Sequence, residues 1–140
     1  MSEDIYRDAI IDLAKSKKGS ERLFNPDITI TLDNPLCGDR ITLDVNLANG
    51  RVTKLGYKVR GCILCEAAAS MIGEHAPNTE VTAITPGRRI LTSILKKETT
   101  ATPTFAPVAE FAPVAQFKSR HECVLLPFEA LEKAVIGALE

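Results

Sequence analysis

The chain has 140 residues, enough for one domain with its own hydrophobic core and without disulfide bonds. Hydrophobic residues make up 45% and charged residues 25%, a mixture that excludes collagen-like, coiled-coil and wholly disordered chains. The formal net charge of −1 provides no basic field for nucleic acid or an anionic membrane. No apolar run approaches the roughly 18 residues of a membrane span, and the acidic first residues are unlike a secretory signal, so we expect a cytoplasmic protein.

The first half of the chain is predicted to form one helix and three strands. A helix is expected over residues 3 to 18, because its apolar side chains recur at helical spacing and Gly19 follows as a stop signal. Alternating apolar and polar residues then predict three antiparallel strands. A three-residue loop over 49–51 keeps the apolar side chains of the last two strands on one face, whereas a two-residue turn on Asn49-Gly50 alone would break this register. The expected pairs are Val45 with Leu55, Leu43 with Tyr57 and Ile41 with Val59.

The second half is predicted to be helical. One helix is expected from Cys62 to about Pro77, and Thr85 and Pro86 are typical of the N-cap and first position of another. The hexapeptide Phe-Ala-Pro-Val-Ala-Glu/Gln occurs at 105–110 and again at 111–116, which is too little for a solenoid. A last helix is expected to hold Pro127 in its first turn. This order predicts an α+β fold, a two-layer domain over residues 1–140 with a three-stranded antiparallel sheet packed against helices.

The four cysteines point to metal binding or thiol chemistry, because cytosolic thiol pairs are kept reduced. Cys37 lies in a polar turn one residue before Gly38 and two before Asp39, so a thiol and a carboxylate can face a common point there. Cys62 and Cys65 have the C-x-x-C spacing at which two sulfurs can reach one zinc ion. These residues are therefore candidate metal ligands.

Cys123 is the candidate reactive thiol. It is expected at the start of the last helix beside Arg120 and His121, where the helix N-terminus and basic neighbours favour a partly exposed thiolate. Cys65 has an equally good interpretation as a buried core residue without a function. Asp39 has a simpler interpretation as a residue that caps its own turn, and His75 is expected outside the site.

Three motifs follow one another along the chain: Asn34-Pro35-Leu36-Cys37-Gly38-Asp39, Gly61-Cys62 before a run of small residues, and Arg120-x-x-Cys123. They resemble those of the U-type iron-sulfur cluster assembly proteins, the family of IscU, SufU and the N-terminal domain of NifU. They extend over nearly the whole chain. The arginine three residues before the last cysteine and the long segment from Thr85 to Phe117 look more like the SufU branch. The IscU branch has histidine directly before its last cysteine, where this chain has Glu122, and a Leu-Pro-Pro-Val-Lys segment where this chain has residues 116–120.

The resemblance implies a SufE/NifU-like two-layer fold and a scaffold for iron-sulfur cluster assembly. Such a scaffold accepts sulfur from a cysteine desulfurase of the SufS or IscS kind, binds iron or a [2Fe-2S] cluster, and serves recipient apo iron-sulfur proteins or carriers. Carried over by motif position, Cys123 accepts the persulfide and Arg120 supports it. The implied ligands of the cluster, of iron or of Zn²⁺ are Cys37, Asp39, Cys62 and Cys123.

Two other functions fit the same residues. The first is a zinc-dependent sulfurtransferase that works as the partner of the desulfurase without building a cluster. The second is a non-enzymatic interaction domain whose zinc site is purely structural. The identity of the fourth ligand is also open. Cys65 matches the family at no motif position, but it would replace Asp39 in a four-thiolate site.

Overall fold

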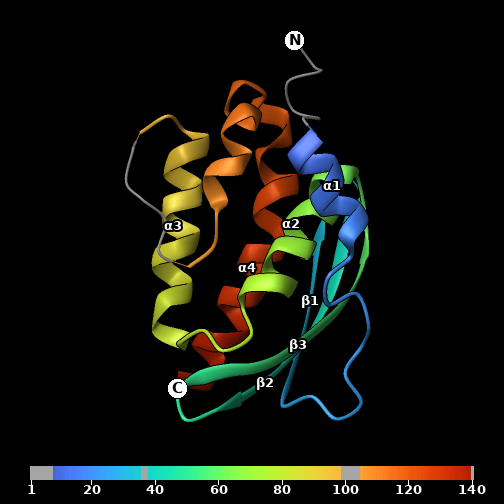
Figure 1. Ribbon diagram of the computed structural model, residues 1–140, viewed down its shortest axis with the longest axis vertical. Coiled ribbons are helices and arrows are strands. Elements are labelled where there is room, and N and C mark those ends of the chain that lie inside the picture. Colours follow the sequence, from blue (N-terminus) through green and yellow to red (C-terminus); the bar gives the residue numbers. More distant parts are fainter. Residues whose placement is uncertain (1–7, 36–37, 99–104, 140) are drawn as a thin grey trace.

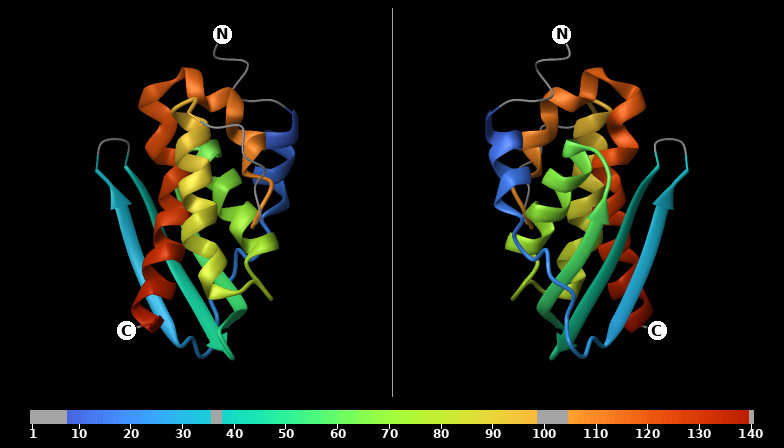
Figure 2. Two further views of the ribbon diagram at one scale, coloured as in Figure 1. Left: turned by 90° about the vertical axis from the view of Figure 1, so that its left-hand side faces the viewer. Right: turned by 90° about the vertical axis from the view of Figure 1, so that its right-hand side faces the viewer.

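The computed structural model describes residues 8–35, 38–98 and 105–139. Three strands form one antiparallel sheet in the order β1-β2-β3. The helices lie on one face of this sheet, with α4 and α2 directly on it and α1 and α3 packed against those two (Figures 1 and 2). The predicted α+β fold is confirmed. The elements are α1 (Asp8–Ser16), β1 (Ile28–Asn34), β2 (Asp39–Ala48), β3 (Arg51–Arg60), α2 (Ile63–His75), η2 (Val81–Ala83), α3 (Ile84–Leu95), η3 (Val108–Gln116), η4 (Lys118–Arg120) and α4 (His121–Leu139).

The pairing of β2 with β3 confirms the predicted register but not the predicted turn. Val45 pairs with Leu55, Leu43 with Tyr57 and Ile41 with Val59. The connection is nevertheless a two-residue turn, since Ala48 pairs with Arg51. Its residues, Asn49 and Gly50, both have positive φ, as a tight hairpin turn requires. A shift in the pairing after Asn46 leaves Thr53 without a partner, and this bulge restores the register that the short turn would otherwise break.

Helix α2 is the centre of the hydrophobic core. It is buried around most of its circumference, because α1 and α4 pack on its sides and β3 on another. Its run of alanines gives it a narrow body that several neighbours can approach closely. No helix within the described residues is both long and apolar enough to cross a membrane. The buried residues of α2 are Leu64, Cys65, Ala67, Ala68, Ala69, Ser70, Met71 and Ile72.

Two helix starts differ from the sequence predictions. Helix α3 begins at Ile84 with Ala83 as its N-cap, so Thr85 is not the cap and Pro86 is the third helical residue, still in the turn whose N–H groups lack helical partners. Helix α4 begins at His121, which places Pro127 inside the helix and not in its first turn. Packing of α4 against the sheet, α2 and α3 supplies the stability that a proline in a helix interior removes.

The repeated hexapeptide forms a 3₁₀ helix, which the sequence analysis did not predict. Phe105, Val108, Phe111 and Val114 recur every third residue and are all buried. Val108, Phe111 and Val114 lie within η3 (Val108–Gln116), and since a 3₁₀ helix has three residues per turn, this spacing puts these three side chains on one face. Phe105 packs edge-on against Phe128 of α4, with ring centroids 6.2 Å apart. The nine residues of η3 therefore form three turns with one apolar face that packs against α3 and α4.

The loop between α1 and β1 is fixed by one buried carboxylate on the sheet. Asp44 of β2 has no exposed surface and accepts hydrogen bonds from Arg22 Nε at 2.5 Å, the Leu23 N–H at 3.0 Å and Thr29 Oγ1 at 2.7 Å. Burial by itself would raise the pKa of Asp44, but these hydrogen bonds and the charge of Arg22 lower it below its ordinary value. The ionised carboxylate therefore stabilises the folded chain.

Replacing this carboxylate is expected to destabilise the protein in a pH-dependent way. Asp44→Asn should lower the free energy of unfolding by about 2 to 3 kcal/mol near neutral pH, because hydrogen bonds to a charged group are lost. Because the pKa of Asp44 is lower in the folded chain, the ionised carboxylate stabilises the fold at pH values above the ordinary aspartate pKa. This stabilisation is lost as the pH falls through the lowered pKa. Urea unfolding should thus show the difference between wild type and variant shrinking in acid. Asp12→Asn, at an exposed position of α1, is the matched control, and an equal loss in both variants would contradict the prediction.

Candidate metal centre

Three potential metal ligands meet at one end of the sheet. Asp39 is the first residue of β2, Cys62 links β3 to α2, and Cys123 is in the first turn of α4. One carboxylate oxygen and the two sulfur atoms all lie within 4.8 Å of one another. Residues from three separate stretches of sequence therefore converge on one point.

Antiparallel pairing explains why Asp39 and Cys62 are neighbours. Arg40 of β2 pairs with Arg60, the last residue of β3. Asp39, which precedes Arg40, therefore lies beside the residues that follow β3. Cys62 has extended backbone and is the N-cap of α2. Helix α4 begins at the same end of the sheet, where η4 leads directly into it (Figure 2). The start of α4 thus completes a site whose other half is formed by the β2–β3 hairpin.

The carboxylate of Asp39 is held by the backbone of the strand-to-helix junction. The Cys62 N–H donates a hydrogen bond to Asp39 Oδ1 at 3.1 Å, and Cys62 Sγ lies 3.9 Å from Oδ2. Asp39 is only 2% exposed. Gly61 gives it room, because a Cβ at that position would lie 2.5 Å from Oδ1. A residue with a side chain there would have to displace the carboxylate.

The thiol of Cys62 is acidified by its surroundings. Its hydrogen bond with Cys123 is the largest cause that lowers its pKa to about 6. Burial opposes this shift, as does the negative charge of Asp39, while the backbone N–H groups of Cys65 and Leu64 at the start of α2 favour it. Cys62 therefore has substantial thiolate character near neutral pH, and the thiolate is the form that binds metals.

Three of the predicted site residues lie together in the structure, and the others that the structure describes do not belong to this group. The group consists of Asp39, Cys62 and Cys123. Cys37 lies outside the described residues. Arg120 is half-buried in η4, just before the helix that carries Cys123. Cys65 is fully buried in the core on α2 and does not belong to the group of three.

One expectation about Cys123 is wrong. It was expected to be a partly exposed thiol, but it is fully buried, and the half-exposed thiol of the pair is Cys62. The reason is that α4 starts at His121 and packs on the sheet from its first turn, so Cys123 faces inward. His121 is at the rim, where its Nε2 lies 3.1 Å from the carbonyl oxygen of Ala115.

The arrangement fits a single tetrahedral metal ion. Zinc binds thiolate sulfur at ~2.3 Å and carboxylate oxygen at roughly 2.0–2.2 Å, so two ligands of one tetrahedral ion lie roughly 3.6–3.8 Å apart. The donor atoms of the three residues, all within 4.8 Å of one another, reach this spacing when they move together by about 1 Å or less. Thiolate and carboxylate ligands suit zinc and iron alike. The described residues supply three ligands and leave room for a fourth.

Gly61 is a site residue to which the sequence analysis gave no role. Its signal in the sequence is a glycine directly before a cysteine, at the junction of a strand and a helix. Glycine at such a junction often marks a close approach of another group. Here the approaching group is the carboxylate of Asp39.

Gly61→Ala is expected to weaken metal binding without unfolding the chain. The added Cβ displaces the Asp39 carboxylate, and the loss of such support around a metal ligand costs about tenfold in affinity. Competition with a chromophoric zinc chelator measures this, and circular dichroism checks the fold. Gly137→Ala is the control, because a Cβ at that helical position meets nothing within 4 Å. Equal zinc affinity in both variants would mean that zinc binding does not depend on the position of the Asp39 carboxylate.

Comparison with known proteins gives a consistent result. The family described as NifU-like N terminal domain matches residues 5–124. The chain is 27% identical to the zinc-dependent sulfurtransferase SufU of Bacillus subtilis, over 95% of this chain and 90% of that protein. It is 25% identical to the iron-sulfur cluster assembly scaffold protein IscU of Thermotoga maritima, over 94% and 92%.

A solved structure supports the same assignment. The N-terminal NifU-like protein from Brucella abortus is 27% identical and superposes with a TM-score of 0.91, covering 96% of this chain and 94% of that one. The family match spans most of the sequence, including Asp39, Cys62 and Cys123. The chain therefore belongs to the family of NifU-like N-terminal domains.

Proposed function

We propose that this protein accepts sulfur from a cysteine desulfurase and serves as a scaffold on which iron and sulfur are assembled into a [2Fe-2S] cluster. The observation that carries the proposal is the convergence of Asp39, Cys62 and Cys123 at one end of the sheet. Relatives named as a sulfurtransferase and as an assembly scaffold, each aligned over more than nine-tenths of this chain, support it. Iron and sulfur are the cargo in this function, and recipient apo-proteins take the product.

Cys37 is the proposed fourth ligand. It precedes Asp39 by two residues, and a fully extended chain spans at most about 7 Å over that length. A third thiolate within this reach, together with Asp39, Cys62 and Cys123, makes a site of three sulfurs and one carboxylate. The carboxylate is the harder ligand and exchanges more readily than thiolate, so Asp39 is the ligand that opens a coordination position.

Cys123 is the proposed sulfur acceptor, with Arg120 favouring its thiolate. In the transfer, the Cys123 thiolate attacks the outer sulfur of a persulfide on the desulfurase. A new sulfur–sulfur bond forms as the old one breaks, and the electron pair leaves on the cysteine thiolate of the partner. No external oxidant or reductant is needed. Because Cys123 is fully buried, docking of the partner has to uncover it.

The second candidate function is that of a zinc-dependent sulfurtransferase. A specific observation favours it: the three donor atoms are spaced for one ion. Two irons bridged by sulfide need ligands that are spread more widely than those of one ion. In this function zinc stays in place, sulfur is passed on by Cys123, and no cluster forms on the protein.

One reconstitution experiment separates these functions. The protein is incubated without oxygen with a cysteine desulfurase, cysteine and ferrous iron. A scaffold develops the visible absorbance of a [2Fe-2S] cluster, whereas a sulfurtransferase keeps zinc and gains sulfur without that absorbance. Cys123→Ser is expected to abolish sulfur uptake, and Cys65→Ser to leave it intact. Mass spectrometry that finds the added sulfur on Cys62 would overturn the choice of Cys123, and no uptake by the wild type would overturn both functions.

The fourth ligand has its own test. Asp39→Ala is expected to retain metal but to exchange it faster, because an exchangeable carboxylate is lost while three thiolates remain. Cys65→Ala should leave metal content unchanged, since Cys65 is in the core and outside the group of ligands. X-ray absorption of the zinc-loaded wild type should show three sulfur neighbours. Four sulfurs, with weakened binding in Cys65→Ala, would assign the fourth position to Cys65.

A further inference from the structure

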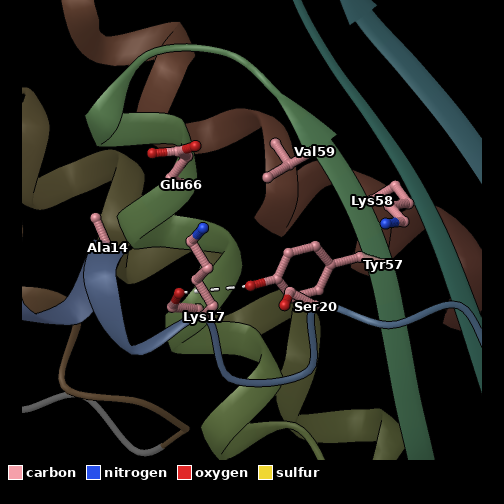
Figure 3. Close-up of a pocket in the computed structure, with 8 residues that line it drawn as sticks. Ala14, Lys17, Ser20, Tyr57, Lys58, Val59 and Glu66 are labelled. Atoms are coloured by element: carbon pink, nitrogen blue, oxygen red, sulfur yellow. Dashed lines mark hydrogen bonds between the residues drawn. The ribbon is translucent and has the colours of Figure 1, made fainter.

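A pocket of about 170 Å³ lies apart from the candidate metal centre, between the end of α1, β3 and α2. None of the three clustered ligands lines it. Figure 3 shows the side chains of Tyr57, Lys17 and Glu66 around a common space. The pocket is far smaller than the roughly 300–1,000 Å³ of sites for drug-sized ligands and cofactors. It is comparable with an engineered cavity of roughly 150 Å³ that binds benzene.

Two buried hydroxyl groups form the inner wall of this pocket. Tyr57 is 1% exposed and Ser70 has no exposed surface, and their hydroxyl oxygens lie 3.4 Å apart. This long contact uses only one of the two hydroxyl protons. Among the described residues neither hydroxyl makes another hydrogen bond. Of these two residues only Tyr57 has any exposed surface, so it is the one that a polar guest in the pocket can contact.

Opposite charges face the pocket from different elements. Lys17 follows α1 and its ammonium extends into the pocket, while Glu66 of α2 lies at the other side (Figure 3). Within the described part of the chain, neither of these charges has an ion-pair partner. Ser20 adds a hydroxyl next to Lys17. A guest with a negative end at Lys17 and a positive end at Glu66 complements both.

The walls of the pocket are fixed before any ligand binds. The turn that carries Lys17 and Ser20 is tied to the sheet by the Tyr57 N–H, which donates to the Gly19 carbonyl at 3.0 Å. On its other side the turn touches α2 so closely that a Cβ on Gly73 would collide with the Lys18 carbonyl. A preorganised site loses little conformational freedom on binding.

We propose that this pocket binds a small free α-amino acid. The carboxylate of the amino acid accepts hydrogen bonds from Lys17 and Ser20, its ammonium group faces Glu66, and Tyr57 closes the inner wall. The small volume restricts the side chain to a few atoms. This site is independent of the proposed sulfur transfer, since it shares no residue with the metal centre.

Titration of the ¹⁵N-labelled full chain with L-alanine tests the proposal. Saturable shifts of the amide signals of Lys17, Ser20, Tyr57 and Glu66 are expected, with a Kd on the order of 1 mM or below. Lys17→Gln and Glu66→Gln should each weaken binding about tenfold, because each removes a hydrogen bond to a charged group. Lys54→Gln on β3 and Glu74→Gln on α2, both exposed and outside the pocket, are matched controls that should bind as the wild type does.

Two smaller probes separate the ends of the amino acid. Propionate carries only the carboxylate and ethylamine only the ammonium group, so each is expected to bind at least tenfold more weakly than L-alanine. Binding of either probe as tightly as L-alanine would overturn the amino-acid assignment. The absence of saturable shifts at these four amides would overturn the site itself.

Discussion

The pairing of β2 with β3 is the constraint on which the site depends. It places the first residue of β2 beside the exit from β3, and so sets Asp39 against the N–H of Cys62. The same pairing aligns the apolar side chains that α2 and α4 cover. Helix α2 follows directly from Cys62, so the cap of the central helix is also a candidate ligand. The hairpin thus aligns the apolar face of the core and sets the positions of Asp39 and Cys62.

Two buried aspartates on β2 have different roles because their neighbours differ. Asp44 is surrounded by donors from Arg22, Leu23 and Thr29, and its negative charge is compensated within the protein. Asp39 has two sulfur atoms beside it, and thiolates add negative charge instead of neutralising it. A cluster of like charges in a buried site is stabilised by a cation. The first aspartate therefore holds the fold and the second is suited to metal.

The sequence predicted those parts of the molecule that depend on local pattern. Alternation gave the register of Tyr57 and its neighbours correctly, and motif order brought Asp39, Cys62 and Cys123 to one site. It failed where tertiary packing decides. The bulge at Thr53 reconciles a tight turn with the register, and packing of α4 overrides the helix-breaking tendency of Pro127. The burial of Cys123 likewise follows from the packing of α4 against the sheet and α2, which no local pattern indicates.

The 3₁₀ segment before α4 has a consequence for the length of the chain. Each residue of a 3₁₀ helix advances it by roughly 2.0 Å, so one hexapeptide adds about 12 Å and two whole turns. Its apolar face then stays aligned, because Val108, Phe111 and Val114 follow one another at intervals of three residues. Insertions or deletions in multiples of three residues preserve the packing face, whereas other lengths rotate it away from the core. The segment before Cys123 is thus a spacer whose length can change only in steps of three residues, one turn of the 3₁₀ helix, without loss of its packing.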